Sequence, residues 1–183
     1  LCIVDTGGSH SDLTDEYAAV RKEMESVAAY LGKSVLREVD ESEFVKNIAD
    51  IRSSCGDRAV LRAMHFYGDN ARVEKQAAAL RAGDFKTFMK YIIESGRSSY
   101  MYNQNVYSCK KAAEQPVSLA LSLSEKLLDG CGAWRVHGGG FAGTIQAFVP
   151  LNKLDEYKDL MERVFGSGSC YVLSVRPVGG VEL

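Results

Sequence analysis

The segment between Trp134 and Thr144 is the part of the chain whose composition best suits chemistry, because glycine fills four of its positions. These glycines are Gly138, Gly139, Gly140 and Gly143. Glycine tolerates positive φ angles, and it lets backbone amides approach an anion or another backbone segment closely. Two interpretations stay open on this pattern alone: an anion-binding turn, or a tight turn whose glycines serve only the backbone.

Two better-known glycine motifs are excluded by their context. Gly138, Gly140 and Gly143 satisfy G-x-G-x-x-G, but a dinucleotide-binding fingerprint must open a helix, whereas the residues from Thr144 onward are typical of a strand. His137 and the three glycines after it are similar to the oxyanion loop of some esterases, yet the sequence has no G-x-S-x-G nucleophile elbow. The sequence also lacks a G-x-x-x-x-G-K-[ST] phosphate loop.

The other reactive side chains form no recognisable site. His10, His65 and His137 show no metal-ligand pattern, so we expect structural or surface imidazoles and no metal centre. Five irregularly spaced cysteines without a C-x-x-C exclude a zinc ribbon and a disulfide framework, and reduced thiols are expected. Tyr17 lies on the apolar stripe of a predicted helix, so its default interpretation is a core tyrosine. These residues by themselves predict no reaction.

Hydrophobic periodicity predicts the elements that must position the glycine segment. A buried strand over 1–5 is followed by helices over 13–31, 40–51, 57–82 and 84–93. A further helix begins at Pro116, and two strands follow it over 133–137 and 144–149. The chain then continues with a helix over 152–164 and a strand over 170–175, and a short strand is suggested near Val181. Asp40 and Asp84 are predicted helix caps. Residues 95–113 lose periodicity and are interpreted as a loop or a broken helix.

Apolar spacing also predicts which helical residues face inward. The 40–51 helix is expected to bury Phe44, Val45, Ile48 and Ile51. The 57–82 helix is expected to bury Val60, Leu61, Met64, Ala71 and Ala78.

The order of the elements predicts an α+β fold. One strand, several helices, two strands, a helix and a strand together indicate a ferredoxin-like split βαβ core, in which a four-stranded antiparallel sheet carries helices on one face. The helices between the first and second strands would form an added helical layer. Because no linker or internal repeat interrupts the pattern, residues 1–183 are assigned to one domain.

Composition narrows the function classes. The chain has 22 Lys and Arg against 24 Asp and Glu, a formal net charge of −2, so no basic excess favours a nucleic-acid partner. Its apolar runs are interrupted by charge well short of a bilayer span, so no membrane segment is expected. The chain begins at Leu1 without Met and without a signal-peptide layout, and we therefore expect a piece of a longer cytoplasmic protein.

Several segments resemble those of the GHMP small-molecule kinases, in the form found in galactokinases. The residues from Arg135 to Thr144 are similar to the third, C-terminal motif of that family. The residues 4–13, with Tyr17 and Arg21, are similar to its H-x-L-x-x-S-x-Y-x-x-R segment. The stretches 36–39, 62–65 and 79–84 follow in the family's order, so the resemblance covers nearly the whole chain.

The resemblance implies a GHMP kinase C-terminal domain whose parent transfers the γ-phosphate of ATP to the 1-hydroxyl of α-D-galactose. Galactose, ATP and an N-terminal half of the same protein would be its partners, and that half would hold most of the ATP and Mg²⁺. Gly138, Gly139, Gly140 and Gly143 would form an active-site turn, and Tyr17 would bind the sugar. No catalytic residue is expected in this chain, which alone should be inactive. The family's motif has glycine where this chain has Ala142, which is tolerable if φ is negative there.

Three alternatives stay open. Kinases of N-acetylgalactosamine share these motifs, and so do galactokinase-like proteins that sense sugar without catalysis. The third alternative, from a different class, is a stand-alone ferredoxin-like module for ligand binding or oligomerisation.

Overall fold

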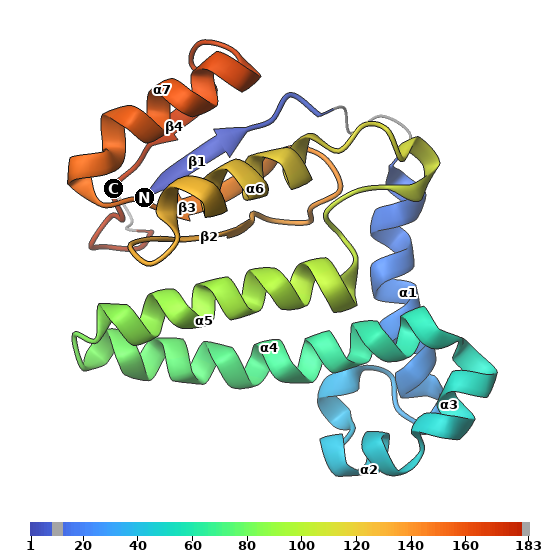
Figure 1. The fold of residues 1–183 in the computed structure, drawn as a ribbon. Coiled ribbons are helices and arrows are strands. Elements are labelled where there is room, and N and C mark those ends of the chain that lie inside the picture. The colour runs from blue at the N-terminus through green and yellow to red at the C-terminus, as the bar shows by residue number, and fades with distance from the viewer. Residues whose placement is uncertain (9–12, 181–183) are drawn as a thin grey trace.

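The computed structural model of the protein describes residues 1–8 and 13–180. Figure 1 shows a small sheet with helices across it and a long helical hairpin beside it, which leads to further helices at the far end. In chain order the elements are β1 (Cys2–Asp5), α1 (Thr14–Tyr30), α2 (Glu41–Lys46), α3 (Ile48–Cys55), α4 (Asp57–Arg81), α5 (Phe85–Ser98), α6 (Pro116–Leu128), β2 (Ala133–Val136), β3 (Thr144–Phe148), α7 (Leu154–Phe165) and β4 (Cys170–Val172). His10 and the strand suggested near Val181 lie outside the described residues.

The four strands form one antiparallel sheet in the order β2-β3-β1-β4. In this register Val4 of β1 pairs with Ile145 of β3 on one side and with Cys170 of β4 on the other. The first and last strands of the chain are therefore neighbours inside the sheet. This is the ferredoxin-like arrangement, and the α+β prediction is confirmed.

The main core lies between the sheet and the helices α6 and α7. Alternate strand residues such as Cys2, Val4 and Ile145 are fully buried there, as the period of two in a strand requires. The helices add Val117 from α6 and Tyr157 from α7. These two helices cover one face of the sheet, in agreement with the sequence pattern.

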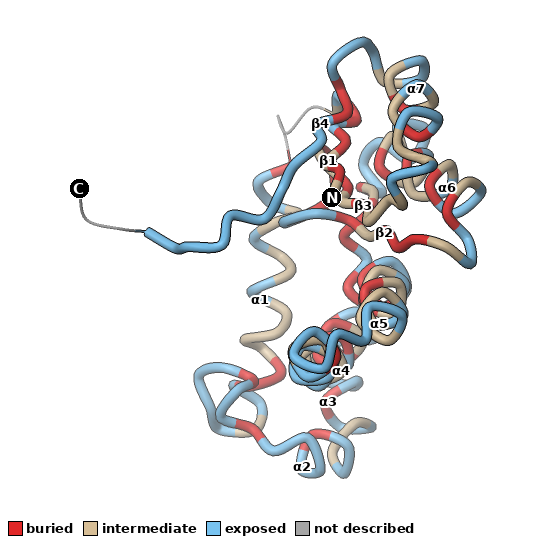
Figure 2. Tube along the Cα trace, turned by 90° about the vertical axis from the view of Figure 1, so that its left-hand side faces the viewer, coloured by how far each residue is buried: buried red, intermediate tan, exposed pale blue. Residues whose placement is uncertain are grey.

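The added helical layer covers the edge of the sheet at β2. Figure 2 views α4 and α5 along their axes and places α5 beside β2. A Cβ on Gly96 of α5 would lie 2.9 Å from the Cβ of Arg135 and 3.1 Å from the carbonyl oxygen of Trp134. Only glycine permits so close an approach, which shields an edge strand that could otherwise pair with another chain.

A second core joins α1 to α4 at the far end of the molecule. Its buried members are Val27, Ala28, Leu36, Val39, Phe44, Ile51, Ala59, Val60, Ala63 and Tyr67. The rings of Phe44 and Tyr67 pack with their centroids 5.4 Å apart. This cluster anchors the helix α1, whose other end reaches the glycine segment.

Two predictions about the helices are wrong in detail. The helix predicted over 40–51 is two helices, because the chain leaves helical geometry at Asn47 (φ −103°, ψ 10°), and Val45 is exposed. In α4, the residues Met64, Ala71 and Ala78 are exposed. The helix instead buries Arg62 and His65, because it packs against α1 and α3 on one side and against α5 on another.

The segment of weak periodicity is a broken helix followed by irregular chain. The helix α5 continues to Ser98 and then widens into one π-helical turn over Ser99–Asn103. Gln104 ends it in the left-handed conformation, at φ 54°. A short 3₁₀ turn over Cys109–Lys111 follows before α6. The chain can therefore reverse direction beside the glycine segment.

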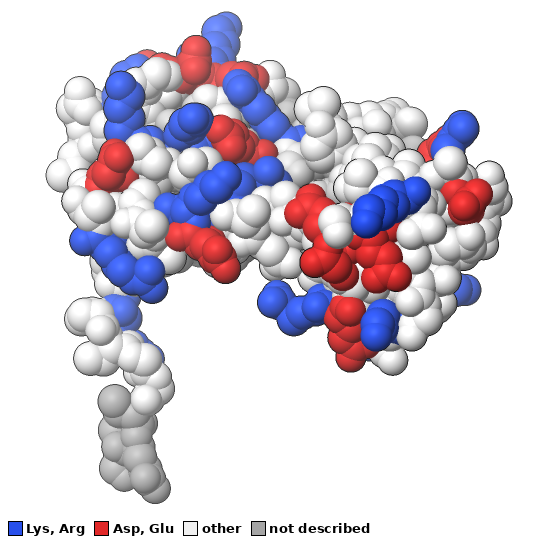
Figure 3. Space-filling view, turned by 90° about the horizontal axis from the view of Figure 1, so that it is seen from below, with Lys and Arg blue, Asp and Glu red and all other residues white. Residues whose placement is uncertain are grey.

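On the face seen in Figure 3, Lys and Arg side chains are interspersed with Asp and Glu side chains. All five cysteines are free thiols, as expected. In the described part of the chain, no helix has the length and apolar character needed to cross a membrane.

Candidate functional site

The glycine segment forms the turn between β2 and β3, and three of its glycines have positive φ. These are Gly138 at 65°, Gly140 at 81° and Gly143 at 100°. Phe141 shares this conformation at 58°, which is unusual for a residue with a side chain. Ala142 is not among the positive-φ residues, so the substitution of alanine for the family's glycine costs no backbone strain.

The glycines meet different surroundings. A Cβ on Gly140 would lie 1.8 Å from the backbone oxygen of Asn105, and one on Gly139 would lie 2.8 Å from Cε1 of Tyr17. A Cβ on Gly138 would meet no heavy atom within 4 Å. The backbone of Asn105 therefore requires glycine at 140 and the ring of Tyr17 requires it at 139, while at 138 the reason is the φ angle alone.

Asn105 holds the turn from the segment that follows α5. Its backbone oxygen accepts a hydrogen bond from the N–H of Phe141 at 2.6 Å, and its Nδ2 donates to the carbonyl oxygen of Gly139 at 3.1 Å. The residue is 4% exposed. Sequence reasoning missed Asn105 because it lies outside every motif, in the stretch where periodicity is lost.

Tyr17 contacts the same turn from α1. Its hydroxyl donates to the carbonyl oxygen of Gly140 at 2.8 Å, and its ring packs edge-on against Phe141 with the centroids 5.3 Å apart. Burial raises the pKa of Tyr17, so the phenol is neutral and can donate at neutral pH. The structure therefore brings together the two predicted site elements, the tyrosine and the glycine turn.

The end of β1 is joined to the other side of the turn. Both the N–H and the hydroxyl of Thr6 donate to the carbonyl oxygen of Gly143, at 2.8 and 2.6 Å. A Cβ on Gly8 would lie 3.0 Å from the Cβ of Ala142. The two segments that resemble kinase motifs, the start of the chain and the glycine turn, are thus in direct contact.

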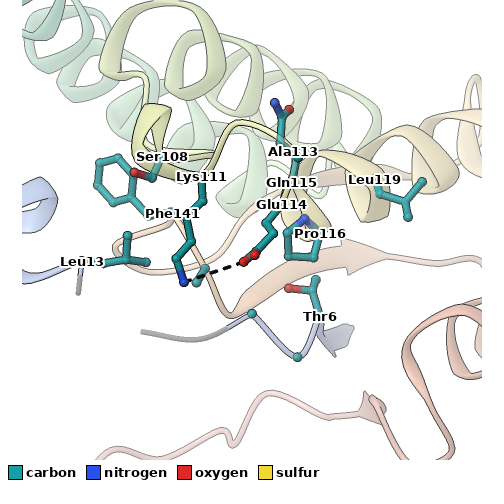
Figure 4. A pocket seen from close by; sticks show the side chains of 13 residues that line it. Thr6, Leu13, Ser108, Lys111, Ala113, Glu114, Gln115, Pro116, Leu119 and Phe141 are labelled. Atoms are coloured by element: carbon teal, nitrogen blue, oxygen red, sulfur yellow. Dashed lines mark ion pairs between the residues drawn. The ribbon is translucent and has the colours of Figure 1, made fainter. Parts of the chain in front are cut away.

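A cavity of about 610 Å³ opens beside the turn. Phe141 and Ala142 form one part of its wall, residues 6–8 and Leu13 a second, and residues of the 108–119 segment the rest. In Figure 4 the side chains of Lys111 and Glu114 extend from that segment toward Thr6 and Leu13. Their charged groups are 3.8 Å apart. The cavity therefore offers a cation and a small-residue wall to a polar ligand, and Lys111 was not predicted.

The described histidines, His65 and His137, make no metal-binding group beside this turn. His65 is buried, with its Nδ1 2.9 Å from Oγ of Ser98, and its Nε2 lies 3.9 Å from a carboxylate oxygen of Asp69, one helical turn further on. His137 is exposed beside Gln146. Over residues 1–8 and 13–180, His, Cys, Asp and Glu side chains form no group of three that could hold a metal ion.

Comparison with known proteins connects this geometry to one group of enzymes. No protein-family model matches the chain. Human galactokinase is 31% identical over 174 residues, which are 95% of this chain and 41% of the human protein. The Bos taurus galactokinase is 35% identical over 173 residues, with 94% and 41% covered. The Mannheimia succiniciproducens galactokinase is 26% identical over 161 residues, with 88% and 40% covered.

The fold agrees with these matches. The crystal structure of Lactococcus lactis galactokinase complexed with galactose superposes with a TM-score of 0.69 at 20% identity, covering 93% of this chain and 43% of that one. The chain spans about 40% of the length of the curated relatives it matches. It therefore matches the C-terminal part of galactokinases, and its fold is consistent with a GHMP kinase C-terminal domain.

Proposed function

We propose that residues 1–183 are the C-terminal domain of a cytoplasmic galactokinase, which transfers the γ-phosphate of ATP to the 1-hydroxyl of α-D-galactose. The observation that carries the proposal is the hydrogen bond from Tyr17 to Gly140. It joins the two segments that resemble galactokinase motifs, although 123 positions separate the residues. Residues 6–8 and Leu13 of the first segment and Phe141 and Ala142 of the second line the same cavity. The similarity to galactokinases over most of the chain supports the same function.

The turn suits phosphoryl transfer because that reaction depends on positioning and on stabilising phosphate charge. Thr6, Asn105 and Tyr17 hold the carbonyl groups of Gly143, Gly139 and Gly140 in place, and the turn reaches the cavity through Phe141 and Ala142. Lys111 and Glu114 line the cavity as an ion pair, so the ammonium group is beside a carboxylate and the pair adds no net charge. A turn held at three points keeps its conformation when a ligand binds, so the binding of sugar and phosphate loses less conformational entropy.

ATP and Mg²⁺ would be bound mainly by an N-terminal half. The described residues gather no metal-binding cluster, so we derive no step through Mg²⁺ from this chain. The groups that activate the sugar hydroxyl would also come from that half, and no catalytic residue is assigned here. In this proposal the chain supplies Tyr17 for the sugar and the glycine turn as active-site backbone.

A direct test is a coupled assay of ADP release on the full-length protein, with galactose and N-acetylgalactosamine offered separately and the phosphorylated product identified by ³¹P NMR. Phosphorylation of galactose at the 1-position supports the proposal. Faster turnover of the acetylated sugar would indicate an N-acetylgalactosamine kinase. Calorimetric binding of galactose without turnover would indicate a sugar sensor. If the protein neither binds nor phosphorylates a sugar, the stand-alone module is the interpretation that remains.

A further inference from the structure

Arg62 of α4 is the most deeply buried charged side chain in the described part of the protein, and the site described above does not use it. Its side chain is 1% exposed. The Nε donates to the backbone oxygen of Asn103 at 3.0 Å, and Nη1 donates to a carboxylate oxygen of Glu23 at 2.8 Å. A buried guanidinium is costly unless it is paired and hydrogen-bonded, and these two partners satisfy that requirement.

Both partners of Arg62 lead to the glycine turn by separate routes. Asn103 is two residues before Asn105, which accepts from Phe141 and donates to Gly139. Glu23 lies on α1, the helix that carries Tyr17, less than two turns from it.

Together these contacts form a closed circuit of hydrogen bonds and short chain segments, which we call the Arg62 circuit. It runs from α1 through Glu23 to Arg62, then to Asn103, Asn105 and the glycine turn, and returns to α1 through the hydroxyl of Tyr17. Four hydrogen bonds between distant parts of the chain therefore belong to one closed path.

We propose that Arg62 is a positioning residue for the glycine turn, which fixes the 103–105 segment against α1 and so sets the distance between the turn and Tyr17. The proposal rests on the proposed function for its catalytic consequence. Its geometric part, the order of the turn, does not. A lysine at position 62 keeps the charge toward Glu23, but a single ammonium lacks the planar fork that reaches two partners in fixed directions.

Arg58 supplies a matched control. It binds the same carboxylate of Glu23, through Nη2 at 2.5 Å and Nε at 3.0 Å, but from the solvent side, where its side chain is 45% exposed. Replacing it with lysine makes the same chemical change at the same partner. The difference between Arg62→Lys and Arg58→Lys therefore reports on the buried environment of Arg62, which includes its contact with Asn103, and not on the ion pair with Glu23.

The experiment uses the full-length protein and two readouts. Hydrogen–deuterium exchange of peptides over 138–143 should become faster in Arg62→Lys and stay at the wild-type rate in Arg58→Lys. In the kinase assay, kcat/KM for galactose should fall about tenfold in Arg62→Lys, as expected for the loss of one hydrogen bond from a charged donor, and by less than about twofold in Arg58→Lys. The melting temperature of each variant shows that both are measured folded.

A double-variant comparison tests whether the contacts of Arg62 and the contact of Asn105 with the turn act together. Asn105→Ala removes the side-chain bond to Gly139. If the circuit acts as a unit, adding Arg62→Lys to Asn105→Ala should lower kcat/KM no further than the more damaging single variant does.

Three results would overturn the proposal: unchanged exchange of the turn in Arg62→Lys, equal effects in Arg58→Lys, or losses that multiply in the double variant. If the wild-type protein phosphorylates no sugar, the proposed function fails with the catalytic consequence, while the exchange data still decide whether Arg62 orders the turn.

Discussion

At the scale of single residues, Gly138 and Gly140 share a left-handed backbone but differ in the space around them. Their φ angles are 65° and 81°, yet only Gly140 has another backbone atom where a Cβ would lie. A substitution at Gly138 therefore meets only the conformational penalty, while one at Gly140 must also displace Asn105.

We expect Gly138→Ala to cost about 1–2 kcal/mol of stability, the ordinary penalty of left-handed geometry for a side chain. Gly140→Ala should cost clearly more, and Gly140→Val should abolish kinase activity of the full-length protein. The cause is the contact with the Asn105 oxygen and not a side chain filling the cavity. Urea unfolding and turnover, measured for all three variants, check this, and wild-type turnover in Gly140→Val would show the turn to be dispensable.

Tyr17→Phe removes one hydroxyl and leaves the ring packed on Phe141. Because the hydroxyl donates its proton to Gly140, it would contact the sugar as an acceptor, and the variant loses both bonds. Losing a hydrogen bond between neutral partners costs about 0.5–1.5 kcal/mol, so affinity for the sugar should fall severalfold while affinity for ATP changes little. Isothermal titration calorimetry of the full-length protein with each ligand separates the two. An unchanged sugar Kd would restore the interpretation of Tyr17 as a packing residue.

What the sequence could reveal at this scale depended on motifs. Tyr17 and the four glycines lie in segments with a recognisable spacing, and the structure places Tyr17 in contact with Gly139 and Gly140. Asn105 lies in no such segment, and Arg62 lies in the 62–65 stretch without a role that the stretch assigns to it. Their partners, the backbone groups of the turn and of Asn103 and the carboxylate of Glu23, are brought near only by the tertiary fold. The carboxylate of Asp69 beside His65 was equally passed over, although it lies one helical turn away.

At the scale of elements, local capping signals were the most reliable guide. Asp40 accepts from the N–H of Ser42, Asp84 accepts from the N–H of Thr87, and Pro116 begins α6, all as predicted. The break at Asn47 and the buried face of α4 could not be predicted in this way. They result from contacts with several neighbouring helices, and a single hydrophobic stripe does not describe a helix packed on more than one side.

The joint between α4, α5 and β2 should make stability depend on pH through His65. Burial lowers the pKa of His65, and the guanidinium groups of Arg72 and Arg135 lower it further, against the opposing carboxylate of Asp69. The unfolded chain, with an ordinary histidine pKa of about 6.5, then binds more protons than the folded one below that pH. The stability that His65 contributes is thus fully present above about pH 6.5, and it is lost as the pH falls toward the lowered pKa of His65 in the folded protein.

We expect the urea midpoint to fall between pH 7.5 and 5.5, and to fall less in His65→Gln, which removes the titrating group. His137→Gln changes an exposed imidazole and serves as the control. If the urea midpoint falls equally with pH in the wild type and in His65→Gln, the role given to the burial of His65 is contradicted.

At the scale of the whole molecule, the described residues form two large hydrophobic cores, one under the sheet and one among α1 to α4, and a small third cluster of Leu13, Phe141 and Ala142. An apolar hollow of about 670 Å³ also opens at the end of the α4–α5 hairpin, where Phe85 is 63% exposed and Val175 is 78% exposed. The cores favour independent folding, and the hollow favours contact with another apolar surface.

We therefore expect residues 1–183 to fold alone, as a monomer or a weak dimer, and to phosphorylate no sugar. A phosphoryl-transfer site with half of its parts loses most of its positioning. Circular dichroism, analytical ultracentrifugation and the coupled assay on this chain beside the full-length protein test the three parts. Clear turnover by the chain alone would overturn its assignment as the C-terminal part of a galactokinase.

The neighbours of β1 in the sheet have a consequence for synthesis. Asp5 pairs with Thr144 and Val4 with Cys170, so β1 finds no strand to pair with until most of the chain has been made. At about 5–20 residues per second, β1 leaves the ribosome roughly 7–30 s before β3. The helices between them make mostly local contacts and can pack in that interval. A nascent chain released before Thr144 would hold a compact helical part and an unpaired apolar strand, which is a substrate for chaperones and proteases.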